Sequence, residues 1–390
     1  MTWGLEFGKS SKVETQEFPR EEYALRYKRA RQLMERKNLD AIFVHETNNY
    51  RYFSGASFVT KNRPSFFALP EEGDPILIMN LFGKERAEIQ SWIKELRTYS
   101  DPFDFDSVTK VLKDAGLAKA TIGAEIDDPF FGSFYALKIR DKMADAEFVD
   151  ASDIIWKLRM EKTEREVDCI RRACDITSNA FDRIFETVHE GMKENEISEA
   201  FYHIFVDFGS PGAGFAMNSG LPYPIGGTEK PLRRGDLLWF DAFAVFKGYY
   251  CDFARVGVVG KPSDKQKRRW EHLQKIVQSG VEAIAPGDEL SKVIKAAIKT
   301  CKSLGIDPAL VQGVGAPRRH HIGHGVGLDA VELPSMLIKN NMPMRPGMVL
   351  TVEPAIIDQS GVYHLEEDVL VTEDGHEILS KASTDIYEIR

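Results

Sequence analysis

The strongest constraint on how this 390-residue chain folds is an apolar segment with a tight turn signal near its middle. The segment reads DLLWFDAFAVFKGYYCDFARVGVV and contains Lys247-Gly248, a pair suited to a two-residue hairpin turn. It therefore predicts two antiparallel strands, residues 236–246 and 249–259, along which side chains alternate between two faces.

Two aspartates of this predicted hairpin fall on the same face. The turn at Lys247-Gly248 places Asp252 across from Phe243, and Asp241 lies diagonally beside it. The other residues of that face are mostly apolar, and two carboxylates in apolar surroundings repel each other unless a cation lies between them. The pair therefore indicates a bound cation, with two incidental acids on a solvated face as the alternative.

A second pair of apolar strands is predicted at residues 347–357 and 363–373, and it also carries facing acids. A turn centred on Ser360 places Glu353 directly opposite Glu367. Like charges that face each other across a strand pair destabilise a sheet. This second acidic pair therefore also indicates a bound cation.

A histidine supplies a nitrogen ligand for such a cation. His324 lies in GHGVGL, where the glycines allow the backbone to approach a bound group closely. Two aspartates, two glutamates and one histidine suit Mn²⁺, Fe²⁺, Co²⁺ or Zn²⁺. Because four carboxylates carry too much negative charge for a single divalent ion, we expect two ions. In the predicted register Glu366, next to Glu367, points to the other face and is interpreted as solvated.

The distribution of apolar runs predicts two domains. In the first part of the chain, short apolar runs alternate with helical patterns, as in an α/β domain. The predicted strands are 40–46, 73–81 and 120–126, and the predicted helices are 20–37, 83–96 and 105–115. Residues 152–189 carry an amphipathic pattern without a break, which predicts one helix that opens an α+β domain. We expect the domains to span residues 1–155 and 156–390.

Composition disfavours several classes of protein. Hydrophobic residues make up 43% and charged residues 28% of the chain, as in a soluble globular protein. The net charge of −9 disfavours a nucleic-acid-binding surface, and no apolar run reaches the length of a membrane span. The cysteines show no CxxC spacing, and the first residues show no apolar leader. We expect a cytoplasmic protein with reduced thiols and no nucleic-acid or membrane partner.

Together, these motifs resemble the creatinase/prolidase/methionine-aminopeptidase superfamily. Its pattern is Asp-x10-Asp, a histidine in GHGxGL, a glutamate in VEP and a glutamate before an aspartate. The resemblance covers residues 155–380 and implies an α/β N-terminal domain followed by an α+β pita-bread C-terminal domain. In the N-terminal part, NNYRYFSG resembles the family's N-x-x-YLTG stretch more loosely. The metal ligands implied by the resemblance are Asp241, Asp252, His324, Glu353 and Glu367.

The resemblance also implies a metal-dependent hydrolase that cleaves a C–N bond in a small substrate, as Xaa-Pro peptidases do. Glu353 would shuttle a proton in addition to binding metal. Mn²⁺ is the first expectation for the two ions, with Co²⁺, Fe²⁺ and Zn²⁺ as alternatives. The creatinase-like branch further implies a homodimer in which Arg63 clamps a substrate carboxylate across the subunit boundary, with an ordinary loop arginine as the alternative.

The sequence departs from the peptidase pattern at positions beside the substrate. Val331 stands where peptidases carry a second histidine, and Tyr223-Pro224 stands where they carry a PH pair. Leu365 stands at the arginine of an Arg-x-Glu-Asp motif, and His320 stands where some members have a substrate-side histidine. Val331 cannot donate a hydrogen bond to a developing oxyanion or leaving nitrogen. The predicted substrate-binding residues are therefore Arg63, Tyr223, His320 and Val331.

These departures leave other functions open. A non-peptidase member that acts on a small zwitterion, such as a creatinase-like amidinohydrolase or a sulfonium-compound lyase, is one alternative. A non-catalytic pita-bread protein that only binds a partner is another, but a binding module has no need of four converging carboxylates. The substrate is expected to be a dipeptide or another small molecule.

Overall fold

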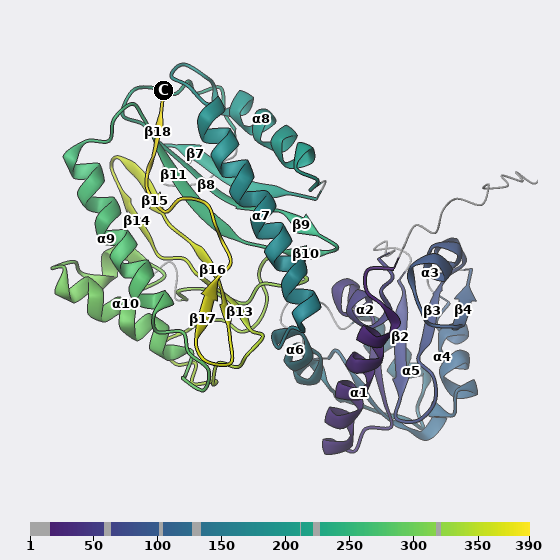
Figure 1. Ribbon diagram of the computed structural model, residues 1–390. Helices are drawn as coiled ribbons and strands as arrows, with labels where there is room; N and C mark the ends of the chain where they lie inside the picture. The colour runs from purple at the N-terminus through teal and green to yellow at the C-terminus, as the bar shows by residue number, and fades with distance from the viewer. Residues whose placement is uncertain are drawn as a thin grey trace, which may run out of the picture. The chain divides into compact units, whose positions relative to one another are not determined.

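The computed structural model describes residues 16–57, 64–100, 104–126, 134–210, 212–220, 227–316 and 321–390. The chain divides into two compact units, Met1–Arg159 and Met160–Arg390. Figure 1 draws the first unit in purple and blue and the second in teal to yellow. Each unit has its own sheet and its own hydrophobic core.

The N-terminal unit is built on a six-stranded mixed sheet with the strand order β4-β3-β2-β1-β5-β6. The β1 strand pairs antiparallel with β2 and parallel with β5, and β3 pairs antiparallel with β2 and parallel with β4. The strands are β1 (Ala41–Val44), β2 (Phe66–Pro70), β3 (Ile76–Asn80), β4 (Glu95–Tyr99), β5 (Thr121–Ala124) and β6 (Glu147–Asp150). The helices are α1 (Arg20–Arg36), α2 (Thr47–Ser54), α3 (Lys84–Gln90), α4 (Phe105–Asp114) and α5 (Phe134–Lys142), with the 3₁₀ turns η1 (Leu81–Gly83) and η2 (Leu117–Lys119).

Helices cover both faces of this sheet (Figure 1), and β1 is buried at every position. On one face, Val108 of α4 shares a core with Phe43 of β1. On the other face, Tyr27 of α1 and Phe53 of α2 stack on Phe67 of β2. Burial on both faces explains why the central strands read as continuous apolar runs.

Most of the predicted elements of this unit are present, but the prediction of one helix was wrong in its second half. The predicted strands correspond to β1, β3 and β5, and the predicted helices at 20–37 and 105–115 correspond to α1 and α4. The helix predicted to reach residue 96 ends at Gln90, and β4 begins at Glu95. Because β4 is an edge strand, its exposed side chains are polar and its apolar alternation is weak.

The single helix predicted over residues 152–189 is also wrong. The chain forms α6 (Ser152–Met160) and then α7 (Glu164–Thr187). Thr163 caps α7: its hydroxyl accepts a hydrogen bond from the Glu166 N–H, and the Glu166 carboxylate accepts one from the Thr163 N–H. Such a capping box starts a new helix without interrupting the amphipathic pattern.

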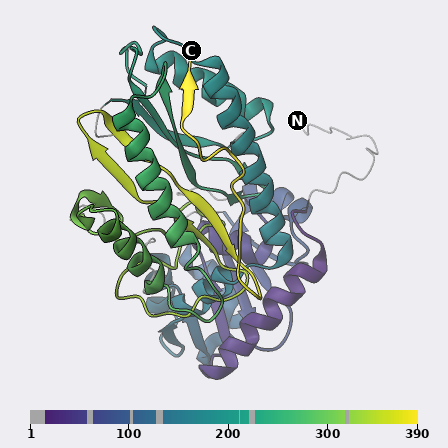
Figure 2. The ribbon, with the colours of Figure 1, turned by 60° about the vertical axis from the view of Figure 1, so that its left-hand side comes forward.

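The C-terminal unit places its sheets between two pairs of helices (Figures 1 and 2). It contains a four-stranded sheet, β18-β11-β8-β7, two three-stranded sheets, β12-β14-β15 and β13-β16-β17, and the pair β10-β9. Helices α7 and α8 contact the first of these sheets, and α9 contacts β13, β14 and β15.

The remaining helices of this unit are α8 (Glu194–Asp207), α9 (Asp264–Val281) and α10 (Ser291–Ser303), with the 3₁₀ turn η3 (Pro308–Leu310). The strands are β7 (Gly214–Ser219), β8 (Leu237–Phe243), β9 (Val245–Phe246), β10 (Tyr249–Tyr250), β11 (Phe253–Val259), β12 (Val311–Gln312), β13 (Val349–Val352), β14 (Ala355–Asp358), β15 (Gly361–His364), β16 (Glu367–Val371), β17 (His376–Ile378) and β18 (Tyr387–Ile389).

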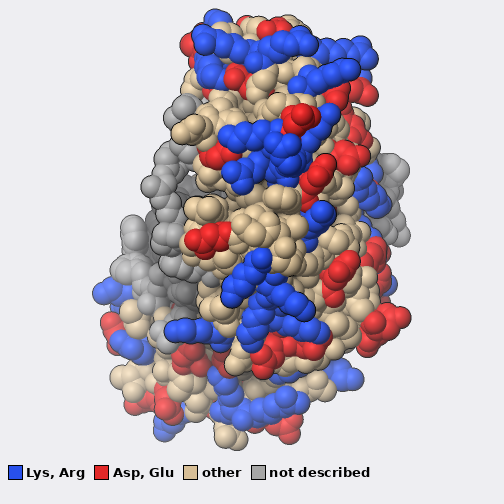
Figure 3. Space-filling view, turned by 90° about the vertical axis from the view of Figure 1, so that its left-hand side faces the viewer, with Lys and Arg blue, Asp and Glu red and all other residues tan. Residues whose placement is uncertain are grey.

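The surface of the molecule carries charges of both signs. Figure 3 shows one face, on which lysine and arginine side chains are interspersed with aspartate and glutamate. Within the described ranges, no helix is both long enough and apolar enough to cross a membrane.

Candidate metal centre

The first predicted hairpin is confirmed in the structure. Lys247 and Gly248 form its two-residue turn with φ angles of 49° and 84°, the left-handed backbone that such a turn requires. Strands β8 and β11 pair with Phe253 opposite Ala242, so the preceding residue, Asp252, lies across from Phe243. The register of this hairpin is therefore the one that the sequence predicts.

The second hairpin has a register one residue away from the predicted one. Strands β14 and β15 are joined by the two-residue turn Gln359-Ser360, with Asp358 opposite Gly361. The side chain of Asp358 accepts a hydrogen bond from the Ser360 N–H at 2.8 Å, which stabilises the turn. Strands β13 and β16 continue the same register, with Val352 opposite Glu367.

This shift exchanges the roles of two neighbouring acids, because side chains alternate between faces along a strand. Continuing the register by one residue places Glu353 opposite Glu366. Glu367 points the other way, where both of its oxygens accept hydrogen bonds from Arg255 Nη2, at 3.0 and 3.1 Å, and one accepts from Ser380. The structure therefore places Glu366, and not the predicted ligand Glu367, on the side of Glu353, and the prediction that Glu366 is solvated is wrong. Glu366 is 1% exposed, and its carboxylate lies within 4.8 Å of ligand atoms of Asp252 and His324.

His324 lies among three of these carboxylates. Ligand atoms of Asp252, His324 and Glu366 are all within 4.8 Å of one another. Nε2 of His324 is 3.8 Å from Oδ2 of Asp252 and 3.5 Å from Oε1 of Glu353. The structure therefore brings together side chains from the two hairpins and from the glycine-rich loop.

A second group adjoins the first and includes the remaining predicted ligand. Ligand atoms of Asp241, His364 and Glu366 are also within 4.8 Å of one another. Because Glu366 belongs to both groups, its carboxylate lies between two neighbouring candidate sites. Four of the five predicted ligands thus come together, and Glu366 takes the place of the fifth.

The chemistry of these donors fits divalent cations. Burial raises the pKa of the Asp252 carboxyl well above its usual range, and the neighbouring Asp241, Asp368 and Glu353 raise it further. Carboxylates packed this closely are ionised at low cost only when a cation neutralises them. Asp241, Asp252, Glu353 and Glu366 together carry a charge that two divalent ions would balance.

The backbone around His324 fixes which ring nitrogen faces the carboxylates. Nδ1 of His324 lies 3.0 Å from the carbonyl oxygen of Gly325, and that oxygen can only accept, so Nδ1 carries the hydrogen. The His324 N–H donates to Oγ1 of Thr351 at 3.1 Å, and the Thr351 N–H donates to the His324 carbonyl at 2.8 Å. Nε2 therefore faces the acids, and in the neutral imidazole it is the nitrogen that can bind a metal ion.

The glycines beside His324 allow close packing within the chain rather than contact with a bound group. A Cβ atom at Gly323 would collide with the carbonyl group of Thr351, and one at Gly325 would collide with that of Leu333. The expectation that these glycines admit a bound group is therefore replaced by a structural role. They let the loop pass directly over β13 and hold His324 in place.

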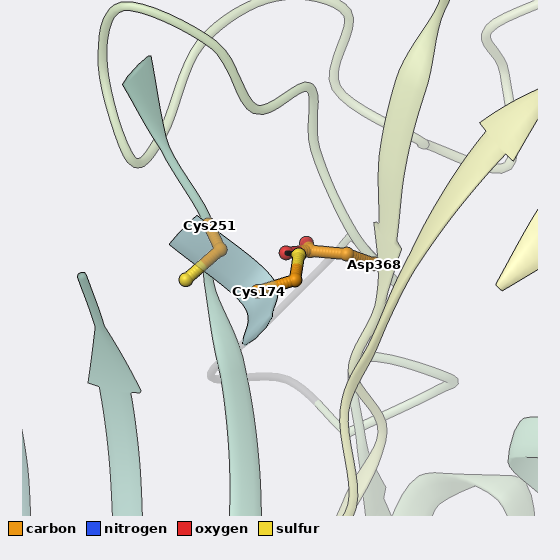
Figure 4. Close-up of side chains that lie close together, drawn as sticks. All are labelled: Cys174, Cys251 and Asp368. Atoms are coloured by element: carbon orange, nitrogen blue, oxygen red, sulfur yellow. Dashed lines mark hydrogen bonds between the residues drawn. The ribbon is translucent and has the colours of Figure 1, made fainter. Parts of the chain in front are cut away.

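A buried cluster beside Asp252 supports its backbone. Oδ2 of Asp368 accepts a hydrogen bond from the Asp252 N–H at 2.9 Å and one from Sγ of Cys174 at 3.4 Å. Figure 4 shows the Cys174 sulfur against the Asp368 carboxylate, with the Cys251 sulfur turned away from it. Burial raises the pKa of Asp368 to about 7 and that of the Cys174 thiol well above its usual range. In this arrangement the Asp368 carboxylate holds the backbone of Asp252 in place beside the acids.

Most of the predicted substrate-binding residues lie outside the described part of the chain: Arg63, Tyr223 and His320. Val331 is described and is 50% exposed. It lies on a loop closed by an antiparallel bridge between Gly325 and Glu332. Val331 is thus accessible to solvent close to His324 in the chain, and it offers no polar side-chain atom.

The structure adds two histidines to the neighbourhood of the acids. With Glu366 in the cluster, the residue two positions earlier is His364, whereas the sequence motif counted from Glu367 gives Leu365. Nε2 of His364 lies 3.7 Å from Oε2 of Glu366. Nδ1 of His321, whose side chain is partly exposed, lies 3.4 Å from Oε1 of Glu353. Recognising a two-residue turn in the sequence DQSG would have revealed His364, whereas no local signal marks His321.

Comparison with known proteins identifies the family to which this site belongs. Residues 168–373 match metallopeptidase family M24, and residues 26–161 match the creatinase/prolidase N-terminal domain. The chain belongs to metallopeptidase family M24. Its α/β N-terminal domain and pita-bread C-terminal domain confirm the predicted fold class.

Alignments with relatives in this family cover nearly the whole length of this chain. It is 27% identical to the Xaa-Pro dipeptidase of Pyrococcus furiosus over 363 residues, which cover 90% of this chain and 97% of the relative. The solved Xaa-Pro dipeptidase from Bacillus anthracis aligns with a TM-score of 0.82 and 25% identity, covering 94% of this chain and 100% of that one. The prolidase from Pyrococcus horikoshii aligns with a TM-score of 0.78 and 26% identity, covering 92% and 99%. The chain is therefore a hydrolase of the metallopeptidase type, from a family that uses divalent metal ions.

Proposed function

We propose that this M24 chain is a dinuclear metallohydrolase that cleaves a C–N bond in a small, Xaa-Pro-like substrate of the cytoplasm. The observation that carries the proposal is the group formed by Asp252, His324 and Glu366, whose ligand atoms lie within 4.8 Å of one another. The relatives named Xaa-Pro dipeptidases support the substrate class. The buried, free cysteines are compatible with a reducing compartment.

The residues that would hold the two ions come from both hairpins and the glycine-rich loop. Mn²⁺ is the first candidate because most of the donor atoms are oxygens, with Co²⁺, Fe²⁺ and Zn²⁺ as alternatives. When bound, such ions polarise a scissile carbonyl group and lower the pKa of a water molecule. The five ligands that we assign are Asp241, Asp252, His324, Glu353 and Glu366.

Glu353 is the residue that we assign to proton transfer. Its side chain is 1% exposed, and its backbone N–H donates to the carbonyl of Ile322 at 2.9 Å. A carboxylate held in this way takes a proton from the attacking water and delivers it to the leaving nitrogen. The partly exposed His321, 3.4 Å from Oε1 of Glu353, lies beside this path.

A second candidate function is the cleavage of a small zwitterion that is not a peptide. Val331 favours it, because a half-exposed, branched apolar side chain replaces the histidine that peptidases of the family carry there. That replacement makes this wall of the site drier and removes a hydrogen-bond donor. Loss of one positioned donor or general acid costs a factor of about 10²–10⁴ in rate, so Xaa-Pro dipeptides should be poor substrates.

The test is a substrate panel assayed with Mn²⁺, Co²⁺ and Zn²⁺: Xaa-Pro dipeptides, N-acyl amino acids, guanidino acids and sulfonium zwitterions. We expect turnover of one C–N substrate class, its loss in Glu353→Gln, and Xaa-Pro cleavage about 10²–10⁴-fold slower than in a histidine-containing relative. Val331→His alone should not restore Xaa-Pro cleavage, because the Tyr223-Pro224 position lacks its histidine too.

Two results of this panel would contradict the proposal. Efficient Xaa-Pro turnover by the unmodified protein would place it among the ordinary dipeptidases and remove the significance of Val331. A protein that holds its metal ions but is inert on every substrate class would favour the alternative of a binding protein.

We also propose that the chain forms a homodimer in which Arg63 reaches the substrate site of the other subunit. The support is the resemblance of the stretch SGASFVTKNRPSFF to the creatinase segment that crosses between subunits. Light scattering should give a mass of twice 44.1 kDa at micromolar concentration. A monomer under those conditions would remove Arg63 from the active site.

A further inference from the structure

His364 is held in a fixed position beside two of the assigned metal ligands. It lies two residues before Glu366, so the two side chains project to the same side of the chain. Its ring packs against the indole of Trp239, with ring centroids 5.8 Å apart, and its side chain is 3% exposed. Trp239 and Asp241 lie on the same face of β8, because they are two residues apart. The imidazole is therefore confined between a packed aromatic surface and the acids.

The separation of His364 from Glu366 suits two ligands of one ion better than a hydrogen bond. Nε2 and Oε2 are 3.7 Å apart, which exceeds the roughly 2.7–3.2 Å of an N–H···O hydrogen bond. Two atoms that are each about 2.1 Å from one metal ion stand roughly 3–4 Å apart. His324 shows the same separations from its own carboxylates, 3.8 and 3.5 Å. The two histidines are therefore placed alike relative to the acids.

The residue type at position 364 determines whether the side chain offers a donor atom to a metal ion. Family members often carry an arginine two residues before the last ligand, in the Arg-x-Glu-Asp motif. A guanidinium group stays protonated and has no lone pair for a metal ion, whereas a neutral imidazole has one. The chain has thus exchanged a fixed positive charge for a nitrogen donor at the edge of its metal centre.

We propose, on the basis of the dinuclear function proposed above, that His364 is a further metal ligand. It binds through Nε2 the ion that Asp241 and Glu366 share, while His324 binds the ion that Asp252 and Glu366 share. Each ion then has one imidazole nitrogen. Because imidazole suits Zn²⁺, Co²⁺ and Fe²⁺ while carboxylates suit Mn²⁺, His364 shifts the metal preference of the centre away from Mn²⁺.

The test uses the full-length chain loaded with Zn²⁺, with X-ray absorption at the zinc edge and elemental analysis as readouts. With both histidines bound, the unmodified protein should show an average of about one imidazole per zinc ion, and His364→Gln about one half. The Gln variant should also bind one of its two ions more than about 100-fold more weakly, which exceeds the effect of residues that only orient a ligand.

Two further variants sharpen the test. His364→Arg, which introduces the residue of other family members and has no lone pair for a metal ion, should likewise bind one ion more weakly and show about half an imidazole per zinc ion. In competition experiments its preference for Mn²⁺ over Zn²⁺ should rise by about tenfold or more. The matched control is His376→Gln, which replaces a part-buried histidine whose Nδ1 contacts the carbonyl of Ile284, and it should change neither readout.

The possible outcomes separate this inference from the proposed function. About half an imidazole per zinc in the unmodified protein, or zinc affinity and metal preference unchanged in both His364 variants, would overturn the assignment and leave the dinuclear centre intact. An unmodified protein that retains no divalent ion would refute the centre itself. If His364→Gln fails to fold, the imidazole count of the unmodified protein still decides the question.

Discussion

In the N-terminal unit, the buried carboxylates of Glu46 and Glu125 lie among partners from the same unit. Glu125 accepts hydrogen bonds from the N–H groups of His45 and Glu46, at 2.7 and 3.0 Å, and from the side chain of Asn49 at 2.7 Å. One of its oxygens is also 2.8 Å from Nδ1 of His45. In the C-terminal unit, by contrast, buried carboxylates from two hairpins face one another and share imidazole neighbours.

The pKa values of Glu125 and Asp252 express this difference. Burial acts to raise the pKa of Glu125, but the charge and hydrogen bonds of His45, together with the Glu46 N–H, outweigh it and hold the pKa below its usual range. Burial raises the pKa of Asp252 well above its usual range, and neighbouring carboxyls add to the increase. In the first group, hydrogen-bond donors and charges within the protein stabilise the carboxylate of Glu125. In the second group, the ionised carboxylates need bound cations to balance their charge, because their nearest charged neighbours are also acids.

The largest expected effect concerns the adjacent residues Glu366 and Glu367. Glu366 belongs to the acid cluster, whereas Glu367 forms a buried ion pair with Arg255. Glu366→Gln should lose bound divalent metal and hydrolytic activity together, because the carboxylate between the two candidate sites is removed. Glu367→Gln should keep its metal but unfold about 3–5 kcal/mol more easily, because Arg255 is left buried without its carboxylate partner. Elemental analysis and urea unfolding measure the two effects.

Each variant serves as the control for the other. Metal loss in Glu367→Gln with full metal content in Glu366→Gln would restore the register that the sequence predicts and refute the one in the structure. Loss of metal in both variants with equal destabilisation would show that the two acids do not belong to separate environments.

Removal of metal should affect the two units differently. An ion present at about 1,000 times its Kd stabilises the folded state by about 4 kcal/mol, and chelation removes that contribution. Hydrogen exchange followed by mass spectrometry should then show faster exchange in β8, β11 and β13 to β16, with no change in β1 and β5. Equal changes in both units, or no change in either, would contradict the view that only the C-terminal acids need cations.

The two hairpins show how far a sequence determines such a site. Lys247-Gly248 marks its turn clearly, because a glycine accommodates the positive φ that the turn requires, and the predicted register is right. Gln359-Ser360 carries no glycine within the turn, and the predicted turn centre was displaced toward Ser360. Since a shift of one residue turns every side chain to the opposite face, this small error misassigned both Glu366 and Glu367.

Other features of the centre depend on tertiary structure that no local pattern encodes. The contact of His321 with Glu353 joins two segments separated by more than thirty residues, and the packing of His364 on Trp239 joins two different sheets. The close passage of the His324 loop over Thr351 explains its glycines better than any bound group does. The residue types of the centre were thus readable from the sequence, whereas their neighbours required the assembled fold.

The smallest expected effect concerns the charge of Glu46 in the N-terminal network. Burial raises the pKa of its carboxyl from the usual 4.5 to about 7, against the N–H donors of Asn48 and Asn49, which act to lower it. Between these values the folded chain binds a proton that the unfolded chain does not, so the free energy of unfolding should fall as pH rises through this window. The contribution is fully present below pH 4.5, is lost above about pH 7, and amounts to at most about 3 kcal/mol.

The variant Glu46→Gln tests this pH dependence, because its side chain cannot ionise while its amide oxygen still accepts the same hydrogen bonds. In urea unfolding it should gain stability relative to the unmodified protein between about pH 5 and pH 8. Parallel pH profiles for the two proteins would show that Glu46 is ionised throughout, and that both units bury charged acids.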